Sequence, residues 1–275
     1  MSDFLATMAA GSHRRVQEAR RVLADAEMWR WAESSPAPPP LLLSGQGFDV
    51  IAEVKLRSPA VGQLAGGDED VEARVTAYAR AGAAAVSVLT EPDRFEGSLD
   101  HLEQAARALH KAGRVPAMRK DFLVDPYQVA EARLAGAGGI LVIVRMLSRA
   151  ELDALIEAAA RLGLFVLIEA FDEADIRVAT ELLAAHDGKG AKLLVGVNSR
   201  DLVTLKVVPG RLEQLAGLLP SGVPLVAESG VADAADAARL ARAGYSLALI
   251  GSALMTAADP SALLSDMLKA ARAAR

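Results

Sequence analysis

Charged side chains end several apolar runs of this sequence. Five of them are Glu53, Lys55, Lys120, Glu169 and Glu228. Runs rich in Val, Ile, Leu and Ala are typical of buried strands, and α/β folds carry their chemistry at the carboxyl ends of such strands. A lysine there can protonate a carbonyl or hydroxyl oxygen, and a glutamate can accept a proton, where burial and neighbours tune their pKa values. A lysine in an apolar pocket could instead form a Schiff base, so both chemistries stay open.

Two consecutive strand ends carry the residues of a phosphate cradle. Ser229 and Gly230 follow the run 224–228, and Gly251 with Ser252 ends the run 246–252. Glycine backbone and hydroxyl groups in the seventh and eighth loops of a barrel often bind phosphate. Either turn alone would be read as an ordinary tight turn, but the pair predicts a phosphate site.

Further residues at the strand ends are polar or bulky and apolar. The polar ones extend the candidate charge cluster, and the apolar ones could wall an aromatic substrate, although each taken singly fits an ordinary core position. The polar residues are Ser58, Asn198 and Arg200, and the apolar residues are Phe95, Phe122, Leu141 and Leu202.

Eight apolar runs alternate with helical segments from residue 48 onward. In one unit Asp125 offers an N-cap carboxylate, Pro126 suits the first helical position and Gly136 ends the helix. Eight strand–helix units in series predict a TIM (β/α)8 barrel, an α/β fold, because no Gly-rich dinucleotide turn follows the first strand. The predicted strands are residues 49–55, 83–90, 115–120, 138–145, 165–169, 193–198, 224–228 and 246–252.

The first part of the chain has a different pattern. Residues 1–33 show helical spacing of apolar residues, and Pro36 and Pro38–Pro40 make a stiff, extended connection. Acidic residues within 1–33 argue against an Arg-rich targeting helix. We therefore expect a helical N-terminal extension over residues 1–47 and a barrel catalytic domain over residues 48–275.

Composition excludes several classes of function. The chain has 275 residues, the length of one large barrel domain, and a formal net charge of −5. That charge argues against nucleic-acid binding, which needs a basic face. No apolar run is long enough to span a bilayer, and no signal peptide is evident, so we expect a cytoplasmic protein without a membrane partner.

Metal and thiol chemistry are also disfavoured. Cysteine is absent, and the four histidines lack metal-ligand spacing, so we expect no metal site and surface or helix-capping roles for the histidines. They are His13, His101, His110 and His186.

The residues at the strand ends, together with the sequence around them, resemble the indole-3-glycerol phosphate synthase family. The matching stretches occur in the same order and at every strand end. A series of this kind is far more specific than one motif. The matching stretches are IAEVKLRSPAVG at 51–62, SVLTEPDRFEGS at 87–98, MRKDFLVDPYQVAEARLAGAGGILVIV at 118–144, VLIEAFDEADI at 166–176, VGVNSRDLVTL at 195–205, VAESGV at 226–231 and LIGSALM at 249–255.

The resemblance implies a carboxy-lyase of tryptophan biosynthesis that needs no cofactor. Its small-molecule substrate would be 1-(2-carboxyphenylamino)-1-deoxyribulose 5-phosphate, which is closed to an indole with loss of CO2 and water. Lys120 would protonate the carbonyl, and Lys55, Glu53 and Glu169 would serve the later proton transfers, with their individual roles open. Glu228 would hold one of the lysines or a ribulose hydroxyl.

The resemblance also implies binding roles for the other strand-end residues. Asn198 and Arg200 would orient Glu169 and the substrate, and Ser58 would lie in a mobile first loop. The phosphate site would be Ser229, Gly230, Gly251 and Ser252, with help from Lys55, and the anthranilate pocket would be Phe95, Phe122, Leu141 and Leu202.

Some features depart from the family pattern or leave alternatives. Residues 31–43 lack the usual charged and aromatic residues, and residues 184–192 form a longer connection, which we expect to be a surface loop on the stability face. A Schiff-base aldolase and a non-catalytic sugar-phosphate-binding protein are the competing functions. Use of a substituted anthranilate, and a monomer or a homo-oligomer, are equally compatible with the residues.

Overall fold

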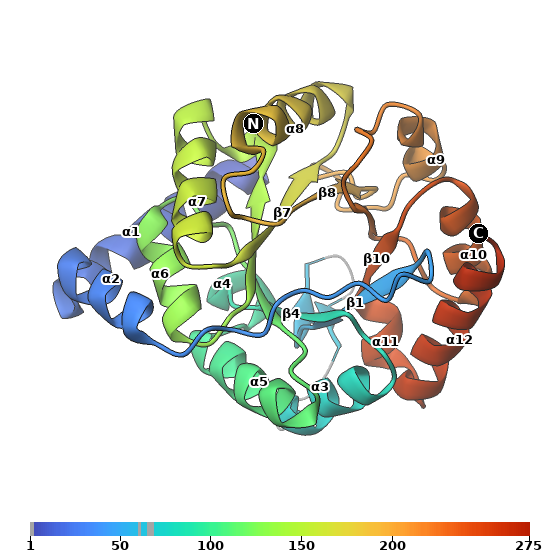
Figure 1. The fold of residues 1–275 in the computed structure, drawn as a ribbon, viewed down its shortest axis with the longest axis horizontal. Coiled ribbons are helices and arrows are strands. Elements are labelled where there is room, and N and C mark those ends of the chain that lie inside the picture. The colour runs from blue at the N-terminus through green and yellow to red at the C-terminus, as the bar shows by residue number, and fades with distance from the viewer. Residues whose placement is uncertain (1–2, 60–61, 65–68) are drawn as a thin grey trace.

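Eight strands form one closed parallel barrel in the computed structural model, which describes residues 3–59, 62–64 and 69–275 (Figure 1). Around the barrel the strand order is β1-β10-β9-β8-β7-β6-β5-β4. The predicted TIM barrel is therefore confirmed, with each predicted strand present. The strands are β1 (Asp49–Val54), β4 (Ala85–Leu89), β5 (Ala117–Lys120), β6 (Gly139–Ile143), β7 (Phe165–Ala170), β8 (Leu193–Asn198), β9 (Leu225–Glu228) and β10 (Leu247–Ile250).

Helices surround the barrel and connect its strands, as the ring in Figure 1 shows. A short hairpin of β2 (Arg57–Ser58) and β3 (Gly62–Gln63) follows β1. Residues 60–61 of the first matching stretch lie outside the described residues, as do residues 1–2 of the extension. The helices after β1 are α3 (Val71–Arg80), α4 (Pro92–Phe95), α5 (Leu99–Ala112), α6 (Pro126–Leu134), η1 (Val144–Met146), α7 (Arg149–Arg161), α8 (Glu173–His186), α9 (Arg211–Ala216), α10 (Ala234–Arg242), α11 (Ser252–Thr256) and α12 (Pro260–Ala273).

The predicted helix boundary at residue 125 is confirmed in detail. The Asp125 side chain accepts a hydrogen bond from the backbone N–H of Tyr127, and Pro126 occupies the first turn of α6. Gly136, just after the helix, has a φ of +88°, which a residue with a Cβ rarely adopts. Capping thus starts α6 and a left-handed glycine ends it.

Alternation along the strands decides which side chains face the barrel interior. On β1, Val50 and Ala52 pack outward in the cluster shared with the helices, whereas Ile51 belongs to the interior cluster. Glu53 follows Ile51 by two residues, so it also faces inward. The same rule places Lys120 above Met118 on β5 and Glu169 above Leu167 on β7. At the carboxyl ends of β1, β5 and β7 the inward-facing residue is therefore charged, above an apolar interior.

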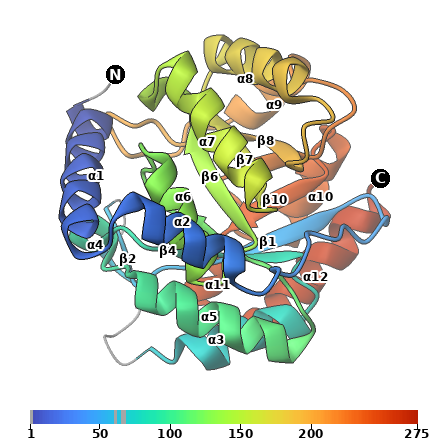
Figure 2. The ribbon, with the colours of Figure 1, turned by 60° about the vertical axis from the view of Figure 1, so that its left-hand side comes forward.

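The N-terminal extension is helical, as predicted, but it consists of two helices. α1 (Asp3–Val22) and α2 (Asp25–Ser34) are separated by Ala24, which has extended backbone angles. Figure 2 shows α1 standing along one side of the barrel and α2 crossing α6. The Tyr127 hydroxyl donates to the Leu23 carbonyl at 2.8 Å and so fixes the junction of the two helices against α6.

The proline-rich stretch continues the chain without regular structure and crosses the amino ends of the strands (Figure 1). Leu41 is buried in the interior cluster together with Phe165 and Leu247, which lie at those ends. The Leu41 carbonyl accepts a hydrogen bond from Lys192 Nζ at 3.0 Å. The predicted connection therefore also covers the floor of the barrel.

The prediction of a surface loop over residues 184–192 is partly wrong, because α8 continues to His186. The His186 ring is buried, and its Nε2 lies 2.7 Å from Asp153 Oδ1 on α7. This pairing anchors the last turn of α8, and the exposed connection begins after it. His186 thus has a buried structural position, which its polar sequence neighbours did not indicate.

None of the helices among the described residues combines the length and the apolar character needed to span a bilayer.

Candidate active site

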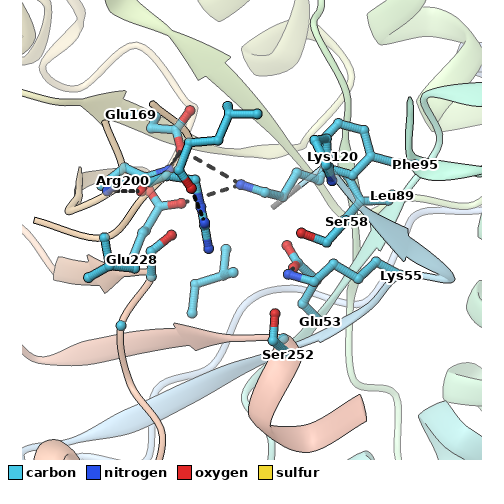
Figure 3. A pocket seen from close by; sticks show the side chains of 18 of the residues that line it. Glu53, Lys55, Ser58, Leu89, Phe95, Lys120, Glu169, Arg200, Glu228 and Ser252 are labelled. Atoms are coloured by element: carbon cyan, nitrogen blue, oxygen red, sulfur yellow. Dashed lines mark hydrogen bonds and ion pairs between the residues drawn. The ribbon is translucent and has the colours of Figure 1, made fainter. Parts of the chain in front are cut away.

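A cavity of about 610 Å³ opens at the carboxyl ends of the barrel strands. Every residue predicted for the site lines this cavity, and Figure 3 shows many of them pointing into it from opposite sides. Parallel strands meet at this edge of the sheet, which explains why residues far apart in sequence converge here. The lining contains Glu53, Lys55, Ser58, Phe95, Lys120, Phe122, Leu141, Glu169, Asn198, Arg200, Leu202, Glu228, Ser229, Gly230, Gly251 and Ser252.

Lys120 is the centre of a buried charge cluster. Its Nζ lies 3.5 Å from Glu228 Oε2 and 3.7 Å from Glu169 Oε1. Asn198 Nδ2 donates a hydrogen bond of 2.7 Å to the same Glu169 oxygen. Figure 3 shows the Lys120 side chain reaching across the cavity toward both carboxyl groups. One ammonium group and two carboxyl groups therefore share the centre of the cavity.

Glu53 and Lys55 form a second charged pair on the other side of the cavity. Lys55 Nζ lies 2.7 Å from Glu53 Oε1, and both side chains are nearly buried. Gly251 makes this pair fit, because a Cβ at position 251 would lie 2.3 Å from Glu53 Oε1 and 2.8 Å from Lys55 Nζ. The glycine predicted for a phosphate turn thus also makes room for a carboxylate and an ammonium group.

The surroundings of these groups determine their charge states. Burial acts to lower the pKa of Lys120, but the nearby Glu169, Glu228 and Glu53 outweigh it, so the pKa is raised. Burial, reinforced by the neighbouring Glu169, raises the pKa of Glu228 well above its ordinary value. Lys120 therefore stays protonated, and the Glu228 carboxyl retains its proton to higher pH than a solvated glutamate.

The other carboxyl group of the site behaves in the opposite way. Burial acts to raise the pKa of Glu53, but the positive charges of Lys55 and Lys120 outweigh it, so the pKa is lowered. Glu53 is therefore ionised at neutral pH, and Lys55 faces a full negative charge.

Apolar residues cover the side of the cavity near β5 and α4. The Phe95 and Phe122 rings lie 6.1 Å apart, and the Phe4 ring of α1 contacts Phe122 edge-on at 5.8 Å. Phe4 and Leu5 line the cavity, although neither was predicted for the site. Their helical spacing indicated an apolar face, but nothing in the sequence indicated that this face lies over the cavity.

Small residues form the third part of the lining, after β9 and β10. Ser229 and Gly230 have φ angles of +67° and +75°, which shape a tight turn. The Ser199 hydroxyl donates to the Ser229 carbonyl at 3.1 Å and holds this turn in place. Ser252 begins α11 directly after Gly251. Sequence reasoning missed Ser199, because nothing in the sequence distinguishes this serine from an ordinary loop residue between Asn198 and Arg200.

A network of ion pairs anchors the strand that carries Lys120. Asp121 accepts hydrogen bonds from Arg15 Nη2 at 2.7 Å and from Thr90 Oγ1 at 2.8 Å. Arg119 Nη2 donates to the same carboxylate at 3.1 Å. Lys120 thus stands between Arg119 and Asp121, which hydrogen bonds hold in place, and Arg15 of α1 supplies one of these bonds to Asp121.

Within the part of the chain that the structure describes, no group of three or more His, Cys, Asp or Glu side chains is arranged to hold a metal ion.

Comparison with known proteins assigns the chain to a family. The sequence model described as indole-3-glycerol phosphate synthase matches residues 9–267. The chain belongs to the indole-3-glycerol phosphate synthase family. Enzymes with this name are carboxy-lyases of tryptophan biosynthesis, so the resemblance found in the sequence is confirmed at the level of the family.

Two relatives named "Indole-3-glycerol phosphate synthase" illustrate the similarity within this family. The protein from Parafrankia sp. (strain EAN1pec) is 45% identical over 229 residues, which is 83% of this chain and 81% of the relative. The protein from Mycobacterium tuberculosis (strain CDC 1551 / Oshkosh) is 41% identical over 243 residues, covering 87% of this chain and 85% of the relative. The similarity thus spans most of both chains.

Solved structures outside the family share the fold. The 3-hexulose-6-phosphate synthase from Salmonella typhimurium has a TM-score of 0.61 and 13% identity, over 83% of this chain and all of that chain. A tryptophan synthase structure from M. tuberculosis has a TM-score of 0.59 and 16% identity, over 82% of this chain and 94% of that chain. At such low identity these similarities concern the barrel alone.

Proposed function

We propose that this chain converts 1-(2-carboxyphenylamino)-1-deoxyribulose 5-phosphate to indole-3-glycerol phosphate by Lys/Glu acid–base catalysis. The observation that carries the proposal is the meeting of Lys55, Lys120 and Glu169 around one cavity. Such a cavity, with apolar residues on one side and charged groups on the other, suits a substrate with an aromatic ring at one end and a sugar phosphate at the other.

Lys120 is the proposed acid of the ring-closing step. Its ammonium group gives a proton to the C2′ carbonyl oxygen while the ring carbon that bears the carboxylate attacks C2′. The new carbon–carbon bond interrupts the aromaticity of the ring. Loss of CO2 from the same ring carbon returns an electron pair to the ring and restores the aromaticity. The raised pKa of Lys120 supports this role, because the residue enters the step protonated.

The dehydration needs a second acid and a base. The C2′ hydroxyl leaves as water after receiving a proton, and a base removes a proton to form the indole double bond. Lys55, paired with the ionised Glu53, is the proposed acid, and Glu169, held by Asn198, is the proposed base. The Glu228 carboxyl, which retains its proton, can donate to a ribulose hydroxyl or to Glu169.

Binding of the substrate divides between two parts of the cavity. The proposed anthranilate pocket is Phe95, Phe122, Leu141 and Leu202, with Phe4 added by the structure. These side chains exclude water, which strengthens the charge interactions with the cationic intermediate. The proposed phosphate site is Ser229, Gly230, Gly251 and Ser252, with Lys55 as the neighbouring cation.

A fluorescence assay for the indole product tests the proposal. Purified protein and the carboxyphenylamino-deoxyribulose phosphate should give indole fluorescence and release one CO2 per turnover. Absence of product with a correctly folded protein would refute the proposed activity. Reduction with borohydride during turnover tests the alternative of a Schiff-base aldolase, because it would trap a covalent adduct between a lysine and the substrate. We expect no covalent adduct, because Lys120 is held in its protonated, non-nucleophilic form.

A further inference from the structure

Three buried polar atoms of the barrel interior make no hydrogen bond within the described part of the chain. They are Glu53 Oε2, Glu228 Oε1 and Ser87 Oγ. The two glutamates belong to the proposed charge cluster. Ser87 is completely buried and does not line the cavity. A buried hydroxyl without a partner is costly, so its position needs a physical reason.

The strand pattern places Ser87 beside Glu53. On β4, Val86 and Val88 pack outward, whereas Ala85 belongs to the interior cluster. Ser87 therefore faces inward like Ala85. In the parallel register of β1 and β4, Ser87 is the direct partner of Glu53. The Ser87 and Glu53 side chains therefore project from neighbouring strands into the same barrel interior.

The Glu53 carboxylate has one satisfied and one unsatisfied oxygen. Oε1 pairs with Lys55 at 2.7 Å, whereas Oε2 is buried and unpaired among the described residues. An ionised carboxylate accepts hydrogen bonds on both oxygens, and burial makes an unfilled position expensive. Ser87 has a hydroxyl donor, and the inward-facing Ala85 and Ile51 that lie beside it have no polar side-chain atoms.

We propose that Ser87 is a positioning residue, which supplies the hydrogen bond to Glu53 Oε2 through one buried water molecule. The direct bond is not formed in the structure, and a water molecule commonly bridges buried polar groups that lie slightly too far apart. Ser87 then fixes the orientation of the carboxylate, and the carboxylate fixes Lys55. The inference rests on the proposed roles of Glu53 and Lys55 in turnover.

Substitutions that keep or remove the hydroxyl test the role. Ser87→Ala should lower kcat about tenfold and leave KM within about twofold, because the substrate itself does not contact residue 87. Ser87→Thr keeps the hydroxyl and should restore most of kcat. Ser87→Cys keeps the size but donates weakly, so it should behave like the alanine variant. A cysteine variant as active as the unsubstituted enzyme would show that only packing matters and would overturn the proposal.

Ser246→Ala is the matched control. Ser246 Oγ bonds the backbone of Leu225 at the opposite end of the barrel, at 2.8 Å from its N–H. Its removal deletes a hydroxyl of the same barrel without reaching the cavity, so kcat should stay unchanged. A tenfold loss in this variant too would contradict a role specific to Ser87.

A double-mutant cycle in urea unfolding separates this inference from the proposed function. Ser87→Ala, Glu53→Gln and the double variant should give non-additive changes in the free energy of unfolding, because the two groups share one hydrogen-bonded unit. Additive changes would overturn the coupling. This measurement needs no substrate, so it holds its meaning even if the fluorescence assay shows no indole formation. A high-resolution crystal structure should also show one water molecule between Ser87 Oγ and Glu53 Oε2.

Discussion

Lys120 Nζ lies 3.5 Å from Glu228 Oε2, although 108 residues separate the two in the chain. This closeness brings together a lysine that keeps its proton and a glutamate whose burial favours the protonated form. The pair therefore presents proton donors to the cavity, whereas the lowered pKa of Glu53 supplies the cavity with a negative charge. Several outcomes can be expected from this arrangement.

Lys120→Met should lower kcat by at least about 100-fold, because the ring-closing step loses its acid. The fold should persist, since the methionine keeps most of the length of the lysine side chain. Initial rates from indole fluorescence and circular dichroism spectra measure the two effects. Lys111→Met, on the exposed side of α5, is the control and should keep full activity. Turnover close to normal in Lys120→Met would remove the assigned acid.

Glu228→Gln should change how stability depends on pH. The folded protein holds the Glu228 proton above the pKa of the unfolded chain, so stability falls as pH rises from the ordinary glutamate range toward the raised pKa. Glutamine removes this titration. Relative to the unsubstituted protein, the variant should therefore gain stability between pH 5 and pH 8. The gain in the free energy of unfolding should be about 1.4 kcal/mol for each pKa unit of the shift, and it should appear as a higher relative Tm at pH 8. Identical pH profiles of Tm in both proteins would contradict the raised pKa.

Gly196→Ala should lower kcat about 100-fold. A Cβ at this position on β8 would lie 2.1 Å from Glu228 Oε1 and 3.0 Å from Leu167 Cδ1, so the Glu228 carboxyl group has to shift from its position beside Lys120. Gly217→Ala is the matched control, because a Cβ there meets nothing within 4 Å. Steady-state kinetics of both variants measure the effect. Equal activities would mean that the position of Glu228 is unimportant for turnover.

Phe4→Ala should raise KM about tenfold with a smaller change in kcat. The ring covers Phe122 edge-on at 5.8 Å and closes the apolar part of the cavity, so its loss admits water to the anthranilate pocket. Val22→Ala, on the exposed end of the same helix, should leave KM unchanged. A normal KM in Phe4→Ala would show that α1 does not contribute to substrate binding.

Ser252→Ala should mainly raise KM, because it removes a hydroxyl from the proposed phosphate site. Inorganic phosphate, used as a competitive inhibitor, provides a second measurement, and its inhibition constant should rise by a similar factor. Thr180→Ala is the control, because it removes a hydroxyl that donates to the Ile176 carbonyl on α8 and does not line the cavity. If kcat fell while both binding constants stayed normal, Ser252 would belong to the chemistry and not to phosphate binding.

The barrel and the charged residues could be predicted because both depend on local pattern. An apolar run that ends in Glu53, Lys120 or Glu169 indicates a buried strand with a polar end, and closure of the barrel brings those ends together. The protonation of Glu228 could not be predicted in this way. The raised pKa of Glu228 depends on burial and on the approach of Glu169, which only the packed structure specifies.

The contacts of the N-terminal extension could also not be predicted from the sequence. The spacing of Phe4, Leu5 and Met8 predicts an apolar helix face, but the partner of that face, Phe122, is a property of tertiary packing. The break at Ala24 was missed because alanine is a good helix former, and no proline or glycine marks the position. His186 was placed wrongly for a similar reason, since its burial depends on Asp153 from the preceding helix.

The extension touches both ends of the barrel, with Phe4 at the cavity and Leu41 under the floor. Between these two residues α2 packs on α6, and the Leu23 carbonyl is held by Tyr127, so this part of the chain follows one path along the barrel. A longer stretch would have to bulge from the barrel, and a shorter one would withdraw Phe4 or Leu41 from its contacts. When residues 35–40 are altered, we therefore expect the length of chain between Phe4 and Leu41 to matter more than the composition of the linker.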